Sequence, residues 1–229
     1  MLLSPAELFT PQLPFASYSS TFCVADYQDS DFAHYAQPLP DKLGRAVAKR
    51  KAEYLAGRHC ASQALQMLGL PHTVIASADN RAPIWPTGIQ GTISHTQEVA
   101  MAMVSDDPKV RGLGIDLERK MSDKQERELQ TQILAKAEQA AFEQLSKTQS
   151  CPLTLIFSAK ESIYKALYPV VQRFFGFEAA CLIEHSDNQL HFALTETLHE
   201  TLPQGTRISV YYQLSDELVL TECCLRAAP

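Results

Sequence analysis

Two acidic signatures, about forty residues apart, hold the side chains best suited to chemistry. The first spans residues 114–118 (GIDLE), where apolar and acidic residues alternate as in a strand with one buried face. Asp116 and Glu118 then share the other face. Because adjacent carboxylates repel each other and are hard oxygen donors, they favour a divalent ion such as magnesium or manganese. The exposed face of an ordinary strand would give the same pattern.

The second signature spans residues 157–165 (FSAKESIYK) and predicts a helix that starts at Ser158. Ser158 followed three residues later by Glu161 is a capping-box pattern. Glu161 and Lys165 lie four positions apart on one helix face, where an ion pair is worth about 0.2–0.5 kcal/mol. The structural interpretation makes Glu161 a helix cap, whereas the functional one makes it a metal ligand or base and has Lys165 reach an anionic substrate. Spacing alone does not decide between them.

The two signatures, together with three further blocks, resemble the 4′-phosphopantetheinyl transferases. The further blocks are residues 49–58 (KRKAEYLAGR), 81–86 (RAPIWP) and 91–96 (GTISHT). Their order is similar to that in the enterobactin-synthetase branch of the surfactin-type group, and the match covers residues 42–165. Five blocks in order are specific, although any one of them is weak. The first forty and last sixty residues match only loosely.

The resemblance implies a fold and a reaction. The fold would be α+β, with two pseudo-symmetric lobes of largely antiparallel sheet and packed helices, residues 1–110 and 111–229, and the active site in the cleft between them. The first lobe would bind the phosphates of coenzyme A, and the second would bind magnesium and catalyse. The enzyme, of the holo-[acyl-carrier-protein] synthase type, would move the 4′-phosphopantetheine arm of coenzyme A to a serine of an apo acyl or peptidyl carrier protein. Siderophore, nonribosomal peptide or polyketide synthesis would use the product.

The resemblance also implies roles for individual residues. Magnesium, or manganese in its place, would bind Asp116, Glu118 and Glu161, with positive charge added by Lys165 and Lys160. Glu161 is favoured as the base over a metal-bound water, with His95 as the next candidate. Arg81 stands where related enzymes often have Lys, which changes the donor geometry. The residues expected to bind the nucleotide part of coenzyme A are Lys42, Arg45, Arg58, Arg81, Ser94 and His95.

Composition limits the other function classes. The chain has 229 residues, a formal net charge of −6, 45% hydrophobic and 20% charged residues, which is ordinary for a soluble globular protein. The negative charge disfavours a nucleic-acid binder, although six basic residues lie between Lys42 and Arg58. Two alternatives stay open: a divalent-metal phosphohydrolase or nuclease, and a catalytically silent module that binds carrier proteins.

Composition also predicts the compartment. No apolar run approaches the roughly 18 residues of a membrane span, and the first residues do not resemble a signal peptide. Six cysteines without Cys-x-x-Cys spacing predict free thiols. We therefore expect a cytoplasmic protein, and the resemblance implies a monomer.

The periodicity of apolar residues predicts the elements that must position these side chains. In the first half we expect a short strand at 22–25, a helix from Lys42 to Leu68 with Arg58 inside its apolar stripe, and a strand at 99–104. That strand is expected to form a hairpin with the strand of Asp116, with Ser94 and His95 at the sheet edge. In the second half we expect one or two helices over 122–145 and an antiparallel sheet built from runs at 180–183, 189–194, 207–212 and 217–221.

Overall fold

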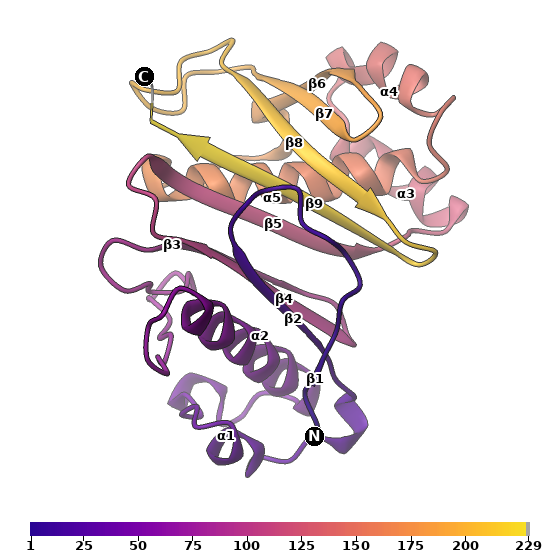
Figure 1. The fold of residues 1–229 in the computed structure, drawn as a ribbon. Coiled ribbons are helices and arrows are strands. Elements are labelled where there is room, and N and C mark those ends of the chain that lie inside the picture. The colour runs from indigo at the N-terminus through magenta and orange to yellow at the C-terminus, as the bar shows by residue number, and fades with distance from the viewer. Residues whose placement is uncertain (228–229) are drawn as a thin grey trace. The chain divides into compact units, whose positions relative to one another are not determined.

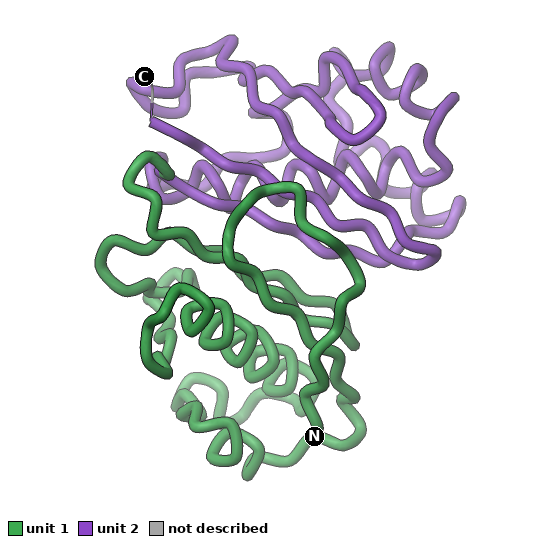
Figure 2. Tube along the Cα trace, viewed as in Figure 1, with its two compact units in different colours: residues 1–110 green, residues 111–229 purple. Residues whose placement is uncertain are grey.

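The computed structural model describes residues 1–227, and the chain divides into two compact units at residue 110 (Figures 1 and 2). Unit 1 is Met1–Val110 and unit 2 begins at Arg111. Each unit packs one 20-residue helix against an antiparallel sheet of four strands in unit 1 and five in unit 2. The α+β class predicted from the sequence is therefore confirmed.

Unit 1 pairs its strands in the order β1-β2-β4-β3, with helix α2 (Ala48–Met67) packed on the sheet. The small buried residues Ala52, Ala56, Cys60 and Ala64 recur every fourth position of α2 and let the helix lie close to β4. The strands are β1 (Ser4–Pro5), β2 (Ala16–Thr21), β3 (Gln90–His95) and β4 (Val99–Ser105), and the short helix α1 is Asp31–His34.

Two predicted boundaries in unit 1 are wrong. Residues 41–43 form a 3₁₀ turn that ends at Gly44, so α2 starts at Ala48 rather than at Lys42, and the exposed Val47 is its N-cap rather than part of an apolar stripe. The strand expected at 22–25 does not form, and the strand in this part of the chain is β2, which ends at Thr21. Thr21 pairs with Val99, the first residue of β4, so the residues after it have no strand to pair with.

Unit 2 pairs its strands in the order β5-β9-β8-β7-β6, and the antiparallel sheet predicted for the second half is confirmed. The predicted hairpin between the 99–104 strand and the Asp116 strand is wrong, because β4 already has β2 and β3 on its two edges and β5 pairs with β9. The strands are β5 (Val110–Arg119), β6 (Ala180–His185), β7 (Gln189–Leu194), β8 (Arg207–Leu214) and β9 (Leu218–Arg226).

Helix α5 (Pro152–Val171) packs on the unit 2 sheet, and its buried apolar residues share a core with Phe192, Val210 and Val219. The predicted helical stretch at 122–145 is two helices, α3 (Asp123–Ile133) and α4 (Gln139–Leu145), joined by a 3₁₀ turn at Lys136–Glu138. A second 3₁₀ turn of unit 2, Phe177–Ala179, precedes β6. In unit 1, a 3₁₀ turn at Val24–Asp26 follows β2.

All six cysteines are free thiols. Across the described residues, no helix combines the length and apolar character that a membrane span requires.

Candidate active site

Strand β5 and helix α5 bring the acidic signatures together inside unit 2. Asp116 is buried on β5, and the ammonium of Lys165 on α5 lies 2.8 Å from its Oδ1 and 2.9 Å from the carbonyl oxygen of Ile115. Glu118 and Glu161 are each close enough to Asp116 to interact with its charge. The two signatures, separated by forty residues in the sequence, therefore form one charged cluster.

Two glycines allow α5 to approach β5 this closely. A Cβ atom on Gly112 would lie 2.0 Å from the carbonyl oxygen of Ala166, and one on Gly114 would lie 1.8 Å from that of Ser162. Both contacts are far shorter than any side chain tolerates, so only glycine fits at these positions. Gly112 and Gly114 thus set the separation between Asp116 and the helix that carries Glu161 and Lys165.

Ser158 does not cap a helix, and the predicted capping box is wrong. Helix α5 starts at Pro152, which suits the first turn because its missing N–H needs no partner there, and this places Ser158 and Glu161 in the helix interior. The buried Ser158 hydroxyl instead lies 2.9 Å from Oγ1 of Thr221 on β9 and donates to the carbonyl oxygen of Asp116 at 3.4 Å. The capping explanation for Glu161 is thereby removed.

Ser162 and Thr221 extend this buried hydroxyl network. The Ser162 hydroxyl donates to the carbonyl oxygen of Thr221 at 3.1 Å, and Thr221 donates to that of Ser158 at 2.9 Å. These bonds link α5 directly to β9, the strand that pairs with β5. These bonds fix the position of α5 along the sheet, and hence the level along β5 at which Glu161 lies.

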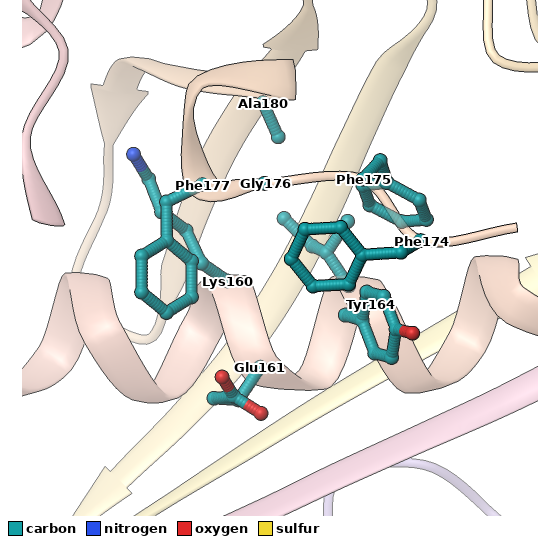
Figure 3. Close-up of a pocket in the computed structure, with 9 residues that line it drawn as sticks. Lys160, Glu161, Tyr164, Phe174, Phe175, Gly176, Phe177 and Ala180 are labelled. Carbon is teal, nitrogen blue, oxygen red and sulfur yellow. The ribbon is translucent and has the colours of Figure 1, made fainter. Parts of the chain in front are cut away.

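Lys160, expected to bind coenzyme A, is buried in an ion pair. Its ammonium lies 2.6 Å from Oε2 of Glu138 and donates to the carbonyl oxygen of Ile133 at 2.9 Å. Glu138 is also fully buried and accepts from the backbone N–H groups of Ala135 and Leu182. Lys160 and Glu161 leave α5 in different directions (Figure 3). The contacts of Lys160 favour a structural role.

Burial and like charge disturb the remaining carboxylates of the cluster. Burial, followed by the charge of Asp116 and that of Glu161, raises the pKa of Glu118 to about 7 against the opposing effect of Lys165. Burial also raises the pKa of Glu161, with Lys165 opposing and Asp116 adding to the shift. Within residues 1–227, no three His, Cys, Asp or Glu side chains are gathered tightly enough to hold a metal as they stand.

An apolar pocket adjoins Glu161. It has a volume of about 300 Å³ and is lined by α5 and the segment that follows it, including Tyr164, Phe174, Phe175 and Phe177. The ring centroid of Tyr164 lies 6.0 Å from that of Phe174 and 5.0 Å from that of Phe175. The Glu161 carboxylate lies at the base of these rings (Figure 3). An extended, weakly polar group could therefore be held beside the acidic cluster.

Unit 1 contains a larger cavity, of about 900 Å³, whose lining carries basic side chains together with the acidic Asp41, Glu53 and Asp79. One wall is a face of α2 on which Arg50, Glu53, Tyr54, Gly57 and Arg58 recur with helical spacing. A Cβ on Gly57 would lie 2.9 Å from Cγ2 of Ile93, so Gly57 lets α2 lie against β3 rather than bending the helix. The cavity has the charge and size required for a nucleotide with several phosphates.

Arg58 is a buried part of the wall of this cavity. Its guanidinium stacks 4.6 Å from the ring centroid of Tyr54 and donates to Oγ of Ser77 at 2.7 Å, while its buried Nε has no partner. Burial of an arginine in an apolar stripe was the signal that marked it in the sequence, and the stacking explains how the charge is accommodated.

The other residues predicted to bind the nucleotide lie at different places. Lys42 and Arg81 line the cavity, and Lys42 forms an exposed ion pair of 2.9 Å with Asp79. His95 also lines it, with Nε2 3.5 Å from Arg50. Ser94 is buried and, as the next residue of a strand, points to the face opposite His95. Arg45 is exposed in the segment before α2 and lies outside the cavity lining.

Sequence reasoning assigned no role to Arg50, Glu53 or Tyr54. The available signal was their spacing from Arg58, because positions 50, 53, 54, 57 and 58 share one helix face. In a helix that starts at Lys42, the basic residues that cluster on one side are Lys42, Arg45 and Lys49 instead.

The chain is similar to known protein families in both of its units. Residues 39–105 match the 4′-phosphopantetheinyl transferase N-terminal domain, and residues 112–223 match the 4′-phosphopantetheinyl transferase superfamily. Enterobactin synthase component D of Escherichia coli K12 is 34% identical over 217 residues, which cover 92% of this chain and 95% of the relative. The Salmonella typhimurium protein of the same name is 32% identical over 220 residues, covering 95% and 91%.

Another relative matches a shorter part of the chain. The 4′-phosphopantetheinyl transferase PptT of Mycobacterium tuberculosis is 35% identical over 157 residues, or 66% of this chain and 67% of the relative. With relatives above 30% identity that are covered almost end to end, the chain belongs to the 4′-phosphopantetheinyl transferase superfamily, in the group of enterobactin synthase component D, and transfers the 4′-phosphopantetheine of coenzyme A to carrier proteins.

Proposed function

We propose that unit 2 performs this transfer with the cluster of Asp116, Glu118, Glu161 and Lys165. The observation that carries the proposal is the glycine-mediated contact of α5 with β5, which gathers three carboxylates and an ammonium at one place. Such clusters with disturbed pKa values are typical of functional sites. The loss of the capping explanation for Glu161 strengthens this proposal.

A magnesium ion, with manganese as a substitute, is the cation proposed for Asp116, Glu118 and Glu161. Three hard oxygen donors from two elements match what these ions bind, and a cation would offset the burial and like charge that raise the pKa of Glu118 and of Glu161. The bound ion would supply charge that stabilises the negative pyrophosphate as the reaction proceeds. The chemistry of the donors therefore fits the ion, and the three side chains would have to move together to bind it.

The side chains of the cluster have separate tasks in the transfer. Glu161 takes the proton from the serine hydroxyl of the carrier, and its raised pKa makes it a better base than an ordinary glutamate. The serine oxygen then bonds to the phosphorus next to the pantetheine, and the bond to adenosine 3′,5′-bisphosphate breaks. Lys165 offers its ammonium to the pyrophosphate oxygens, in addition to orienting Asp116.

We assign binding of the nucleotide phosphates to the unit 1 cavity. Arg58 is buried and held by Ser77 and Tyr54, so it is preorganised for an anion. Arg50, Lys42 and Arg81 are exposed and can turn toward a ligand, since exposed ion pairs such as that of Lys42 with Asp79 contribute little stability. Arg45 and Ser94 have smaller parts in this assignment, because neither lines the cavity.

The apolar pocket beside Glu161 is proposed to hold the pantetheine arm. The arm is joined to the phosphorus that reacts, so it must lie next to the base, and its methyl groups and chain suit a pocket lined by Tyr164, Phe174 and Phe175. The names of the relatives support a carrier protein of siderophore synthesis as the acceptor.

Intact-mass measurement tests the proposed function. The protein is incubated with coenzyme A, magnesium and an apo carrier protein from a siderophore synthetase, and the carrier should gain the mass of one phosphopantetheine. Chelation should stop the gain, and Asp116→Asn should reduce it by at least about a hundredfold while the matched surface variant Asp187→Asn has no effect. An Asp116→Asn protein with wild-type activity would show that the site lies elsewhere.

Kinetics test the cavity separately. Arg50→Ala should raise the KM for coenzyme A and leave that for the carrier nearly unchanged, because contacts to phosphates that do not react mainly provide binding. Arg45→Ala is the matched control outside the cavity lining and should have the smaller effect. A larger effect of Arg45→Ala would move the phosphate site out of the cavity.

A further inference from the structure

The cavity of unit 1 contains one buried carboxylate that its anion-binding role does not explain. Glu53 lies on the same face of α2 as Arg50 and Arg58 and lines the cavity with them. Its side chain is only 11% exposed. A phosphate in this cavity would be repelled by the carboxylate, so Glu53 weakens the binding of an anion unless it also contacts another group of the same ligand.

The protein itself gives Glu53 little to bind. Its recorded ion pair is with Lys49, at 3.9 Å, which is beyond hydrogen-bond distance, and Lys49 is half exposed. Within residues 1–227, no hydrogen bond reaches the Glu53 carboxylate. The carboxylate oxygens remain accessible from the cavity, so their hydrogen-bond donor is water or a group of the ligand that fills the cavity.

Arg58 shows the complementary feature on the next turn of the same helix face. Its Nε is buried and unpartnered, while its terminal nitrogen is used by Ser77 and its plane stacks on Tyr54. The cavity therefore presents an unused acceptor, Glu53, beside a guanidinium that Ser77 and Tyr54 already hold. A phosphate alone offers the acceptor no donor, whereas a nucleotide carries donors of its own.

We propose that Glu53 is a specificity-determining residue that accepts a hydrogen bond from a neutral donor of the coenzyme A nucleotide. The nucleotide has two such donors, the exocyclic amine of adenine and the 2′-hydroxyl of the ribose beside the 3′-phosphate. Either would let Glu53 distinguish the nucleotide from inorganic phosphates and from other phosphorylated ligands, which the arginines alone do not do. The inference rests on the proposed function of the cavity as the nucleotide site.

Calorimetric titration of the full chain tests the proposal with three ligands. These are adenosine 3′,5′-bisphosphate, its 2′-deoxy analogue, and purine riboside 3′,5′-bisphosphate, which lacks the amine. Wild-type protein should bind one analogue about tenfold to a hundredfold more weakly than the parent, as expected for loss of a hydrogen bond to a charged group. The analogue that loses affinity identifies the amine or the hydroxyl as the donor.

The decisive quantity is the ratio of the two affinities, because removing a negative charge can by itself tighten the binding of a bisphosphate. Glu53→Ala should bring the ratio close to one, and Glu53→Gln, which keeps an acceptor, should retain part of it. Lys49→Ala removes the ion-pair partner and leaves the carboxylate in place, so it should keep the wild-type ratio.

Two outcomes would overturn the inference. One is a wild-type protein that binds both analogues as tightly as the parent, and the other is a Glu53→Ala protein that discriminates as well as wild type. Arg50→Ala and Arg58→Ala separate these from a failure of the proposed function. If neither variant weakens binding of adenosine 3′,5′-bisphosphate, the cavity is not the nucleotide site and the role of Glu53 fails with it.

Discussion

The ammonium of Lys165 lies 2.8 Å from Oδ1 of Asp116, so a protein cation already neutralises the carboxylate proposed as a metal ligand. A second hydrogen bond, to the carbonyl oxygen of Ile115, holds the ammonium in place. The same cation opposes the upward pKa shifts of Glu118 and Glu161. Lys165 is therefore linked electrostatically to every carboxylate of the cluster.

Replacing Lys165 should separate its two effects on magnesium and on transfer. Lys165→Met keeps the chain length and removes the charge, so magnesium should bind severalfold more tightly because the competing cation is gone. Transfer should nevertheless fall by at least about tenfold, since the ammonium no longer stabilises the pyrophosphate. Calorimetry measures the first effect and carrier mass the second. Lys124→Met, at an exposed position of α3, is the matched control, and weaker magnesium binding in Lys165→Met would contradict the interpretation.

Glu161→Gln should leave the fold intact and abolish most of the activity. Glutamine preserves length and packing in the helix interior, but it cannot take the serine proton and is a poor magnesium ligand. Loss of a positioned acid–base group typically reduces the rate by about 10²–10⁴. Thermal unfolding should give a Tm close to wild type while kcat falls. If turnover stays high at saturating magnesium, Glu161 is not the base, and His95 becomes the next residue to replace.

Glu118 should make the stability of the metal-free protein depend on pH. Its pKa is about 7 in the folded protein and near 4.5 when unfolded, so between these values the unfolded chain has released a proton that the folded chain keeps. The free energy of unfolding contributed by this group is therefore fully present below pH 4.5 and declines as pH rises toward 7. Urea unfolding at pH 5 and pH 7.5 measures the decline.

The difference between wild type and Glu118→Gln isolates this contribution from other groups that titrate in the same range. The variant should lose less stability than wild type between the two pH values. Magnesium should restore stability to wild type at the higher pH, because ligand carboxylates bind the ion only when deprotonated. Equal pH dependence of the two proteins would show that Glu118 does not have the raised pKa.

Removing one partner of the buried ion pair between Lys160 and Glu138 should destabilise the protein more than replacing both partners with neutral residues. Lys160→Met leaves Glu138 as an uncompensated buried charge and should reduce the free energy of unfolding by about 3–5 kcal/mol. Adding Glu138→Gln removes that charge while an amide oxygen can still accept from Ala135 or Leu182. The double variant should therefore be more stable than Lys160→Met in urea. A double variant less stable than the single one would mean that the charge itself is required.

The sequence by itself determined the family, the fold class and the residues of the acidic cluster. Those conclusions depend on local patterns, such as the alternation around Asp116, the four-residue spacing of Glu161 and Lys165, and the short β-rich runs of the second half, all of which the chain carries regardless of its tertiary contacts. The strands β6 to β9 are predicted for the same reason, since each is a short β-rich run, and in β7 and β8 buried and more exposed residues alternate.

Only the tertiary structure decided which partner each of these residues has. Ser158 and Glu161 fit a capping box by spacing, but α5 starts at Pro152, and the Ser158 hydroxyl lies by Thr221, a residue far away in the sequence. Lys160 stands beside Glu161 in the chain yet pairs with Glu138. Hydrogen bonds and burial join residues that are distant in sequence, and a local pattern contains no information about which distant group will complete them.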